Sequence, residues 1–380
     1  MKQVVHLSTT HTGGAGIAAR HLNVMLNARN FDSQFIALDR KGFHIRRDEE
    51  PISLSLMERT HNKLVTGFNY LLGQPFFSLF DNELNKKTIN KLARIAPIIH
   101  IHNFYNILDE NTFSYIFSRF QQVVLTMHDQ RLFTGGCHYS LKCEKYRYGC
   151  TTCPRVPVFL ENMVFTKLTT LSRILTDRDQ LTIVAPSDWI ANSFRSSSLF
   201  SNQAIVKIPN VLNYPSTSMS SPKFQSNTVS VGFAASARQP IKGREILEHL
   251  RSLEISSNSY FKIYTAKDLG SDMKAFWSRI DLLIVPSLMD NHPNVITEAH
   301  LHGIPVIASN VGGIPEMTIT DFDLLVENAE TWQDQFLDFI KCVQINYTIE
   351  KGLWARNYVI QGIEAALGKH ISLYRSLVSP

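Results

Sequence analysis

Two acidic side chains, Asp290 and Glu298, follow the apolar run IDLLIVPS at residues 280–287. A continuous apolar run of this length is typical of a strand covered on both faces in a parallel sheet. Asp290 then lies in the loop at the carboxyl end of that strand, where open α/β sheets bind ligands. From residue 294 the pattern is helical until Gly303, so a short helix carries Glu298. The electropositive amino end of this helix suits a diphosphate or sugar hydroxyl groups.

Both acids also have a structural interpretation, in which Asp290 caps the helix and Glu298 lies on a solvated face. Two cations, Arg238 and Lys242, follow a second predicted strand in VGFAASARQPIKGREIL and precede a helix. Cations at such a position can neutralise a diphosphate leaving group. The alternative is an ordinary surface pair of little energetic consequence.

The first half of the chain has comparable features at the ends of its predicted strands. The first strand runs into HTGGAGIAARHL, where Gly14 and Gly16 permit close approach of the backbone to a ligand, or only a tight strand-to-helix turn. Two further strands, PIIHIHN and QVVLTMHD, each deliver an imidazole to the same sheet edge, which favours a functional role over a structural one. The side chains at these two strand ends are His102, Asn103, His128 and Asp129.

Four of the five cysteines gather in the segment GGCHYSLKCEKYRYGCTTCP: Cys137, Cys143, Cys150 and Cys153. Disulfides are rare in a reducing cytosol, so clustered thiols predict either a structural zinc site or unliganded thiols that pack a loop. The closing CTTC fits zinc, whereas the wider spacings before it are looser than in a zinc ribbon. Both interpretations stay open.

Length and composition limit the class of protein. The chain of 380 residues is 44% hydrophobic, enough for a large core and two domains. No segment approaches the roughly 20 apolar residues of a membrane helix, and the amino-terminal MKQVVHLSTTHTGGAG does not have the pattern of a signal peptide. We therefore expect a cytosolic protein. The net charge of +5 is too mild for a nucleic-acid binder.

Apolar strand-like runs alternate with helical segments along the chain, which predicts an α/β protein with parallel sheets. The runs are QVVHLST, SQFIAL, PIIHIHN, QVVLTMHD, LTIVAPS, IVKIPN, VSVGFAAS, FKIYTA, DLLIVPS, PVIASN and FDLLVEN. A Ser- and Pro-rich stretch at 214–227 predicts a linker between domains 1–213 and 228–355. The last segment, 356–380, is expected to be a helix that packs back on the first domain.

Taken together, these motifs resemble those of retaining nucleotide-sugar glycosyltransferases of family 4. This family has the GT-B fold, in which two doubly wound, Rossmann-like domains face each other across a cleft. The resemblance spans nearly the whole chain. It is carried by GGAG, MHD, VAPSDWIANSF, IPN, Arg238 with the KG that follows, and above all PSLMDNHPNVITEAHLHGIPVIASNVGGIPE.

The resemblance implies transfer of a sugar from a nucleoside diphosphate sugar to a hydroxyl group, with the anomeric configuration retained and no catalytic metal. Glu298 would accept hydrogen bonds from the ribose, Asp290 would hold the donor sugar, and His128 would lie beside sugar and acceptor. Arg238 and Lys242 would bind the diphosphate. The remaining donor-site positions are Asn291, His292, Pro293, Asn294 and Val295, beside Gly14 and Gly16 of the first domain.

His102, Asn103 and Asp129 would face the acceptor, a glycan or a polyprenyl-diphosphate-linked oligosaccharide of a bacterial surface polysaccharide. The cysteine segment resembles loops of colanic-acid and O-antigen enzymes. An anionic membrane surface is a further expected partner, because the apolar stretch 64–80 follows basic residues. These basic residues are Arg46, Arg47, Arg59 and Lys63.

The chain also departs from the family pattern. The first acid of the pair is Asp290 where glutamate is usual, and Val211, Leu212 and Asn213 replace the usual Gly-Val-Asp after IPN. These differences put the donor base and sugar in doubt more than the reaction class. Alternative functions are a GT-B epimerase or phosphorylase, or a zinc-containing nucleic-acid-binding protein.

Overall fold

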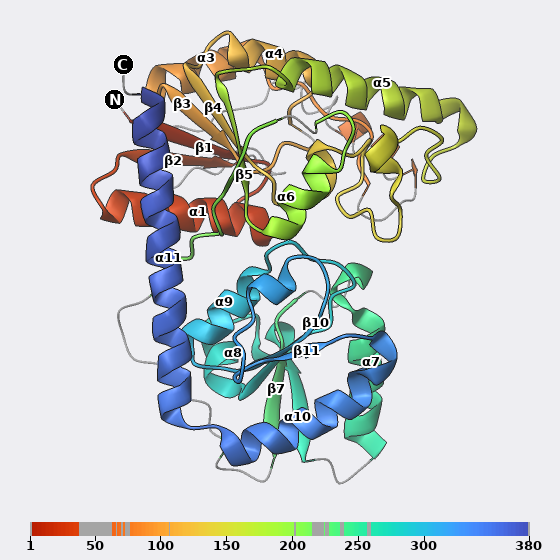
Figure 1. Cartoon of the computed structure of the whole chain (residues 1–380), viewed down its shortest axis with the longest axis vertical. Coiled ribbons are helices and arrows are strands. Elements are labelled where there is room, and N and C mark those ends of the chain that lie inside the picture. Colours follow the sequence, from red (N-terminus) through yellow and green to blue (C-terminus); the bar gives the residue numbers. More distant parts are fainter. Residues whose placement is uncertain are drawn as a thin grey trace. The chain divides into compact units, whose positions relative to one another are not determined.

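The protein is described here from a computed structural model. The structure describes residues 2–37, 63–65, 67–69, 71–72, 77–105, 107–200, 203–214, 224, 228–235, 239–256 and 260–378. The chain forms two compact units. Unit 1 comprises residues 1–213 and 366–380, and unit 2 comprises residues 214–365. Helix α11 (Ile349–Val378) contributes residues to both units (Figure 1).

Unit 1 is built on a parallel sheet whose described strands follow the order β2-β1-β3-β4-β5-β6. The strands are β1 (Val4–Ser8), β2 (Ser33–Ala37), β3 (Ile98–Ile101), β4 (Gln122–Thr126), β5 (Leu181–Ala185) and β6 (Ile205–Lys207). Each lies inside one of the apolar runs noted above. The sequence prediction of strands in this half is therefore confirmed.

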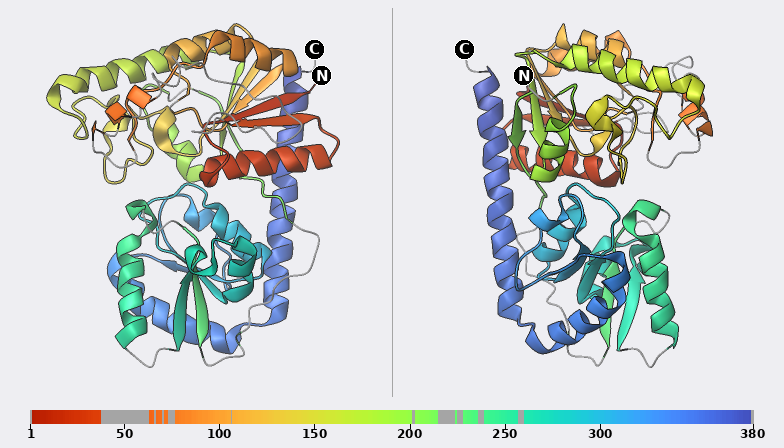
Figure 2. Two further views of the ribbon diagram at one scale, coloured as in Figure 1. Left: turned by 180° about the vertical axis from the view of Figure 1, so that it is seen from behind. Right: turned by 45° about the vertical axis from the view of Figure 1, so that its right-hand side comes forward.

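Helices cover both faces of this sheet, with α3, α4 and α5 on one side and α1 on the other (Figures 1 and 2). The helices of unit 1 are α1 (Gly13–Ala28), α3 (Lys86–Ile95), α4 (Glu110–Phe117), α5 (Val158–Leu175) and α6 (Asp188–Arg195). Capping side chains start several of them. Asn85 accepts a hydrogen bond from Thr88 N, and Asp109 accepts one from Thr112 N.

The two faces of the sheet in unit 1 differ in chemistry. Val5 and Leu7 of β1 belong to the apolar core on the side of α3 and α4. Because successive strand residues point to opposite faces, His6 and His100 lie on the other face, and both are fully buried. There the His100 ring bonds with the Tyr374 hydroxyl of α11.

Unit 2 contains a second parallel sheet, with described strands in the order β11-β10-β9-β7-β8. The strands are β7 (Val229–Phe233), β8 (Phe261–Thr265), β9 (Leu282–Val285), β10 (Val306–Ser309) and β11 (Leu324–Val326). The helices are α7 (Arg244–Ser256), α8 (Met273–Arg279), α9 (Asn294–Leu301) and α10 (Trp332–Asn346). These strands again match the predicted runs.

Apolar side chains of α7 and α10, such as Leu247 and Phe336, pack on one face of this sheet. Those of α8 and α9, such as Phe276 and Ile296, pack on the other. Because β7, β9 and β10 are adjacent and parallel, their carboxyl ends open at one edge. The loops that follow these three strands contain Lys242, Asp290 and the Gly312-Gly313 pair. Within the described part of the chain, no helix is long and apolar enough to cross a membrane.

Candidate active site

Backbone contacts bind the loop after β7 to the loop after β9. Leu288 N donates a hydrogen bond to Ile241 O at 2.8 Å. Gly243 has a φ of +80°, and a Cβ atom there would lie 1.8 Å from Pro286 O. A larger residue could not adopt this conformation or fit this contact, so glycine lets the two loops touch.

The loop after β10 approaches the same place. Gly313 N donates to Asp290 O at 3.0 Å, and a Cβ atom on Gly312 would lie 1.8 Å from Asp290 O. The loop after β10 thus holds the backbone of Asp290, and the loop after β7 supplies the partner of its side chain. Lys242 Nζ lies 2.6 Å from Asp290 Oδ2, and the two side chains are 20% and 8% exposed. Three loops therefore meet around this one acidic residue.

The capping interpretation of Asp290 is wrong. Helix α9 begins at Asn294, its N-cap residue is Pro293, and no side chain bonds there. The Oδ1 atom of Asp290 instead accepts a hydrogen bond from Asn291 N at 3.0 Å. With Lys242 on the other oxygen, the carboxylate is satisfied within its own loop cluster.

Glu298 lies half-buried on α9, not on a solvated face. Burial raises the pKa of its carboxyl group to about 7, because desolvation disfavours the charged form. Among the described residues, the structure records no group that bonds with this carboxylate. A partly dehydrated acid without a partner is typical of a ligand-binding position.

The other predicted donor-site positions of unit 2 surround these two acids in sequence. Asn291, Pro293 and Asn294 are buried, and His292 and Val295 are half-buried. Arg238 lies outside the described residues. The structure thus brings Lys242 and Asp290 together and places Asn294 and Glu298 on the same helix.

In unit 1, Gly14 and Gly16 lie in the first turn of α1. A Cβ atom on Gly16 would lie 2.1 Å from Thr10 O, whereas one on Gly14 would meet nothing within 4 Å. Packing of the preceding turn against the helix therefore explains Gly16 without a ligand. Packing does not explain Gly14.

His102 and His128 lie side by side at the ends of β3 and β4. His102 Nδ1 lies 3.2 Å from His128 Nε2, and His102 Nε2 lies 2.9 Å from His6 Nδ1. Only 4% of His102 is exposed. Its two ring nitrogens face imidazoles, so the geometry favours a supporting role for His102. The neighbouring Asn103 accepts a hydrogen bond at its carbonyl from Thr9.

Asp129 bonds with a histidine that the sequence interpretation overlooked. His138 Nδ1 lies 2.6 Å from Asp129 Oδ2, and His138 Nε2 lies 3.1 Å from Ser78 Oγ. Burial alone would raise the pKa of Asp129, but the charge and hydrogen bond of His138, with the Arg131 N–H, lower it overall. The sequence signal for His138 is its place in GGCH, shortly after the MHD motif.

The structure favours the packing interpretation of the four clustered cysteines. Cys137, Cys150 and Cys153 are buried in the core of unit 1. Burial raises the pKa of the Cys137 thiol to about 12 and that of Cys150 to about 11. In the described part of the chain, ligand atoms of three or more side chains lie within 4.8 Å of one another at His6, His100 and His102, and not at the cysteines. This geometry favours packed thiols over a zinc site.

A protein-family model matches part of unit 2. Residues 231–342 match the family model described as "Glycosyl transferases group 1". A curated relative, the putative colanic acid biosynthesis glycosyl transferase WcaC of Escherichia coli, is 23% identical over 218 residues. This match covers 50% of the chain and 52% of the relative, about half of its length. Unit 2 thus carries a glycosyl transferase group 1 domain.

Solved structures establish the fold. Sucrose-phosphate synthase from Thermosynechococcus elongatus is similar with a TM-score of 0.58 and 18% identity, covering 99% of both chains. The catalytic domain of starch synthase IV from Arabidopsis thaliana, bound to ADP and acarbose, has a TM-score of 0.57 and 13% identity over 100% of both chains. Anabaena HepE in complex with UDP has a TM-score of 0.55 and 13% identity, covering 98% of this chain and 100% of HepE.

The two parallel-sheet α/β units therefore define a GT-B fold. The fold class expected from the sequence is confirmed.

The pair between Lys242 and Asp290 predicts a specific pattern of stabilities. Lys242→Met should lower the free energy of unfolding by about 1 to 3 kcal/mol, because it leaves a buried carboxylate without a cation. Adding Asp290→Asn should recover part of this loss. Urea denaturation of the two single variants and the double variant measures the coupling. Strictly additive effects would show that the ion pair does not hold the loops.

Buried thiols predict selective alkylation. At pH 8, about one in a thousand molecules carries a Cys150 thiolate, whereas Cys342 is exposed. Iodoacetamide should therefore modify Cys342 well before Cys137 or Cys150, as peptide mass spectrometry would show. A chelator should not change the rates. Faster modification of the four clustered cysteines after chelation, with release of zinc, would contradict the packing interpretation.

Proposed function

We propose that this protein is a retaining glycosyltransferase that moves a hexose from a nucleoside diphosphate sugar to a hydroxyl group. The acceptor is a glycan or lipid-linked oligosaccharide in bacterial surface polysaccharide synthesis. The observation that carries the proposal is the edge of the sheet in unit 2. There Lys242, Asp290 and the half-buried Glu298 occur within the family-matched residues 231–342.

We assign donor binding to the domain 228–355. Glu298 is the carboxylate that accepts hydrogen bonds from the ribose hydroxyl groups. Its raised pKa supports this role, because a dehydrated carboxylate gains more from two donors than a solvated one does. HepE was solved with UDP and starch synthase IV with ADP, so proteins of this fold hold nucleoside diphosphates.

Lys242 and Arg238 are proposed to neutralise the diphosphate, whose negative charge grows as the glycosidic bond breaks. Positioned cations and amide groups stabilise that charge in the transition state, so the proposal requires no catalytic metal. Asp290 positions Lys242 by the 2.6 Å contact and, with the backbone of residues 291–294, holds the donor sugar.

We assign acceptor binding to the domain 1–213. His128 is proposed to lie beside the donor sugar, and the partly exposed pair of Asp129 and His138 to face the acceptor hydroxyl. A lipid-linked acceptor places the enzyme at the cytoplasmic face of a membrane as a peripheral protein. Leu64, Phe68 and Leu71 are 57%, 56% and 78% exposed and support such contact.

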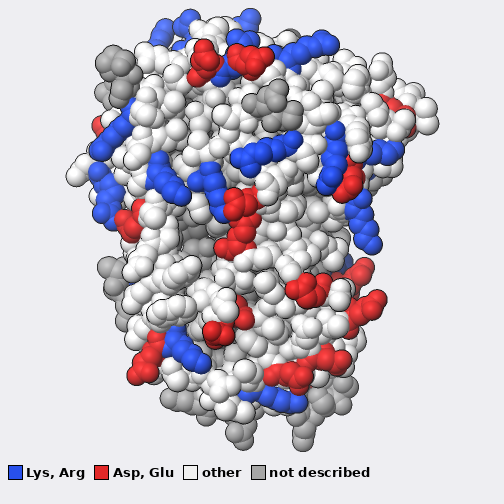
Figure 3. Space-filling view, in the orientation of Figure 1, with Lys and Arg blue, Asp and Glu red and all other residues white. Residues whose placement is uncertain are grey.

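Other parts of the predicted membrane stretch behave differently. Phe77 is buried in the core of unit 1, while Phe76, Arg46, Arg47 and Arg59 lie outside the described residues. On the face of unit 1 in Figure 3, Lys and Arg side chains are spread among neutral ones and interrupted by Asp and Glu. Weak attraction to an anionic surface fits this distribution better than tight binding of nucleic acid.

Donor binding should depend on pH through Glu298. A screen of UDP, GDP and ADP sugars by thermal shift identifies the donor, because a ligand at 100 times its Kd stabilises by about 2.7 kcal/mol. The affinity for that donor should then rise by up to about tenfold per pH unit between pH 5 and 7, since the ionised carboxylate accepts the ribose hydrogen bonds. Titration calorimetry at several pH values measures this affinity. Nucleotide sugars suit the test because their diphosphate diesters do not titrate in this range.

Two variants make the test specific. Glu298→Gln should bind the donor more weakly at pH 8 and without this pH dependence. Glu330→Gln, which changes an exposed glutamate of the same unit, should behave as the wild-type protein does. An unchanged pH profile in Glu298→Gln would exclude the ribose role. Absence of a shift with any nucleotide sugar would exclude the proposed function.

Membrane association should require the exposed apolar side chains. Phe68→Ser with Leu71→Ser should lower partition onto anionic vesicles at least about tenfold, because each buried side chain contributes about 1.5 to 3 kcal/mol. Binding of the wild type should weaken as salt rises. Ile345→Ser, which changes a side chain of unit 2 that is 80% exposed, is the matched control. Equal partition onto neutral and anionic vesicles in co-sedimentation would contradict the proposal.

A further inference from the structure

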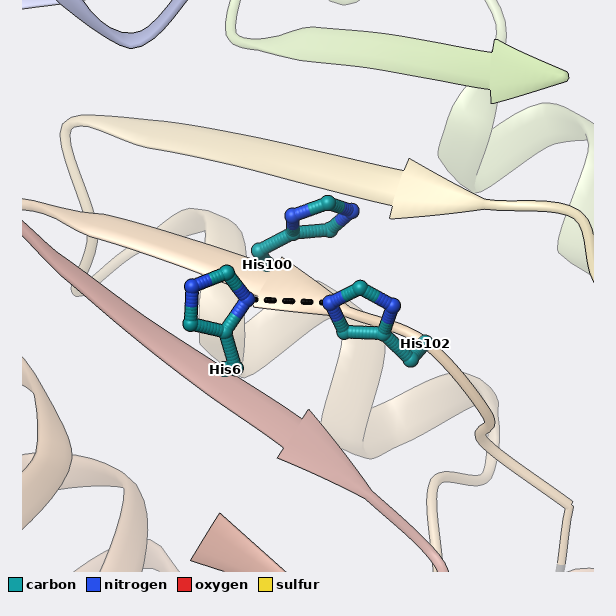
Figure 4. A group of neighbouring side chains, drawn as sticks. All are labelled: His6, His100 and His102. Atoms are coloured by element: carbon teal, nitrogen blue, oxygen red, sulfur yellow. Dashed lines mark hydrogen bonds between the residues drawn. The ribbon is translucent and has the colours of Figure 1, made fainter. Parts of the chain in front are cut away.

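Three histidines from three adjacent strands form one hydrogen-bonded chain in unit 1. His6 Nδ1 lies 2.9 Å from His102 Nε2, and His102 Nδ1 lies 3.2 Å from His128 Nε2. Figure 4 shows the rings of His6 and His102 meeting edge to edge, with His100 beside them. Each link joins two ring nitrogens, so each requires one N–H and one lone pair.

The rings of His6 and His102 are neutral. Desolvation, with a smaller contribution from His370, lowers the pKa of His6 to about 3. Desolvation, followed by the other imidazoles nearby, lowers the pKa of His102 well below its usual value. A neutral imidazole carries one N–H and one lone pair. The chain therefore has two proton arrangements, which run in opposite directions.

The Nε2 atom of His6, at the end of this hydrogen-bonded chain of histidines, distinguishes the two arrangements. His6 Nε2 is buried and bonds with no described group. In one arrangement this atom is a bare nitrogen, His6 donates to His102, and His102 donates to His128. In the other it carries a buried N–H without an acceptor, and the donation runs from His128 inward. Orphaned N–H groups are rarer in proteins than under-satisfied acceptors, which favours the first arrangement.

We propose that His102, supported by His6, is a positioning residue that holds His128 as its Nδ1–H tautomer. In this form Nε2 of His128 accepts a hydrogen bond from His102, and Nδ1 carries the proton. His128 then acts as a hydrogen-bond donor and not as a base. The consequence for catalysis rests on the proposed function, in which the Nδ1–H group of His128 donates a hydrogen bond to an oxygen of the sugar or diphosphate.

His100 provides a matched comparison within the same cluster. It is as buried as His102 and lies against it, with ring centroids 3.9 Å apart and ring planes tilted by 31°. Its nitrogens, however, bond with Tyr374 at 2.6 Å and Thr126 at 2.7 Å. Replacing His100 removes a buried imidazole without cutting the chain to His128.

Long-range proton–nitrogen NMR spectra of the full chain with labelled histidines report each ring's tautomer, and His128→Gln assigns the His128 signals. At pH 7 the wild type should show His6, His102 and His128 as Nδ1–H tautomers, the His128 form by at least about tenfold over Nε2–H. An Nε2–H tautomer at His6 or His128 would overturn the proposal. This result does not depend on any donor, so it is separate from a failure of the proposed function.

Variants test whether His102 acts through its hydrogen bond. His102→Leu should release His128 toward the Nε2–H tautomer, and His102→Asn, whose amide N–H replaces Nδ1–H, should restore the wild-type form. His100→Asn should leave His128 unchanged. Should the leucine variant not fold, the wild-type spectrum still decides. If His102→Leu folds and keeps the wild-type tautomer, the positioning role is wrong.

Two further measurements complete the test. With the donor from the screen, His102→Leu should lower kcat about tenfold with little change in KM, and His102→Asn should recover it. The ligand atoms of His6, His100 and His102 also lie within 4.8 Å of one another. If zinc titration shows one ion bound, and both His100→Asn and His102→Leu lose it, these histidines form a metal site and the positioning role is wrong.

Discussion

The contact between Lys242 and Asp290 is the constraint on which the candidate site in unit 2 depends. A carboxylate that is only 8% exposed needs a cation within reach. The cation and the acid stand on loops after different strands, so satisfying the charge joins the loops. Gly312 lets a third loop approach the same residue. A site preorganised in this way loses less conformational entropy when a ligand binds.

The two units bury polar groups by different means. Unit 2 pairs opposite charges at Lys242 and Asp290 and leaves one acid, Glu298, with a raised pKa. Unit 1 buries neutral imidazoles that bond with one another. Each solution is costly in an apolar core, where hydrophobic side chains would pack without a desolvation penalty. Lys242, Asp290, His102 and His128 lie beyond strand carboxyl ends, where a function would offset that cost.

The segment after β4 combines structural and chemical features. Phe77 forms an antiparallel bridge with Cys137, and Cys150 Sγ accepts a hydrogen bond from Gly135 N at 3.3 Å. These contacts fix the loop that carries His138. The imidazole of His138 thereby reaches Asp129 and Ser78. The cysteines thus support a histidine by packing.

Apolar runs in the sequence by themselves determined the strands and the α/β class, because hydrophobic periodicity is a local property. The loop position of Asp290 and the helical position of Glu298 followed from the same pattern. The sequence could not determine which polar groups bond. His6 and His102 are 96 residues apart in the chain, and they meet because β1 pairs with β3 in a register that sets His6 opposite His100. Likewise, Asp290 pairs with Lys242 instead of capping α9. Partner choice among buried groups depends on register and loop packing, which only the tertiary structure decides.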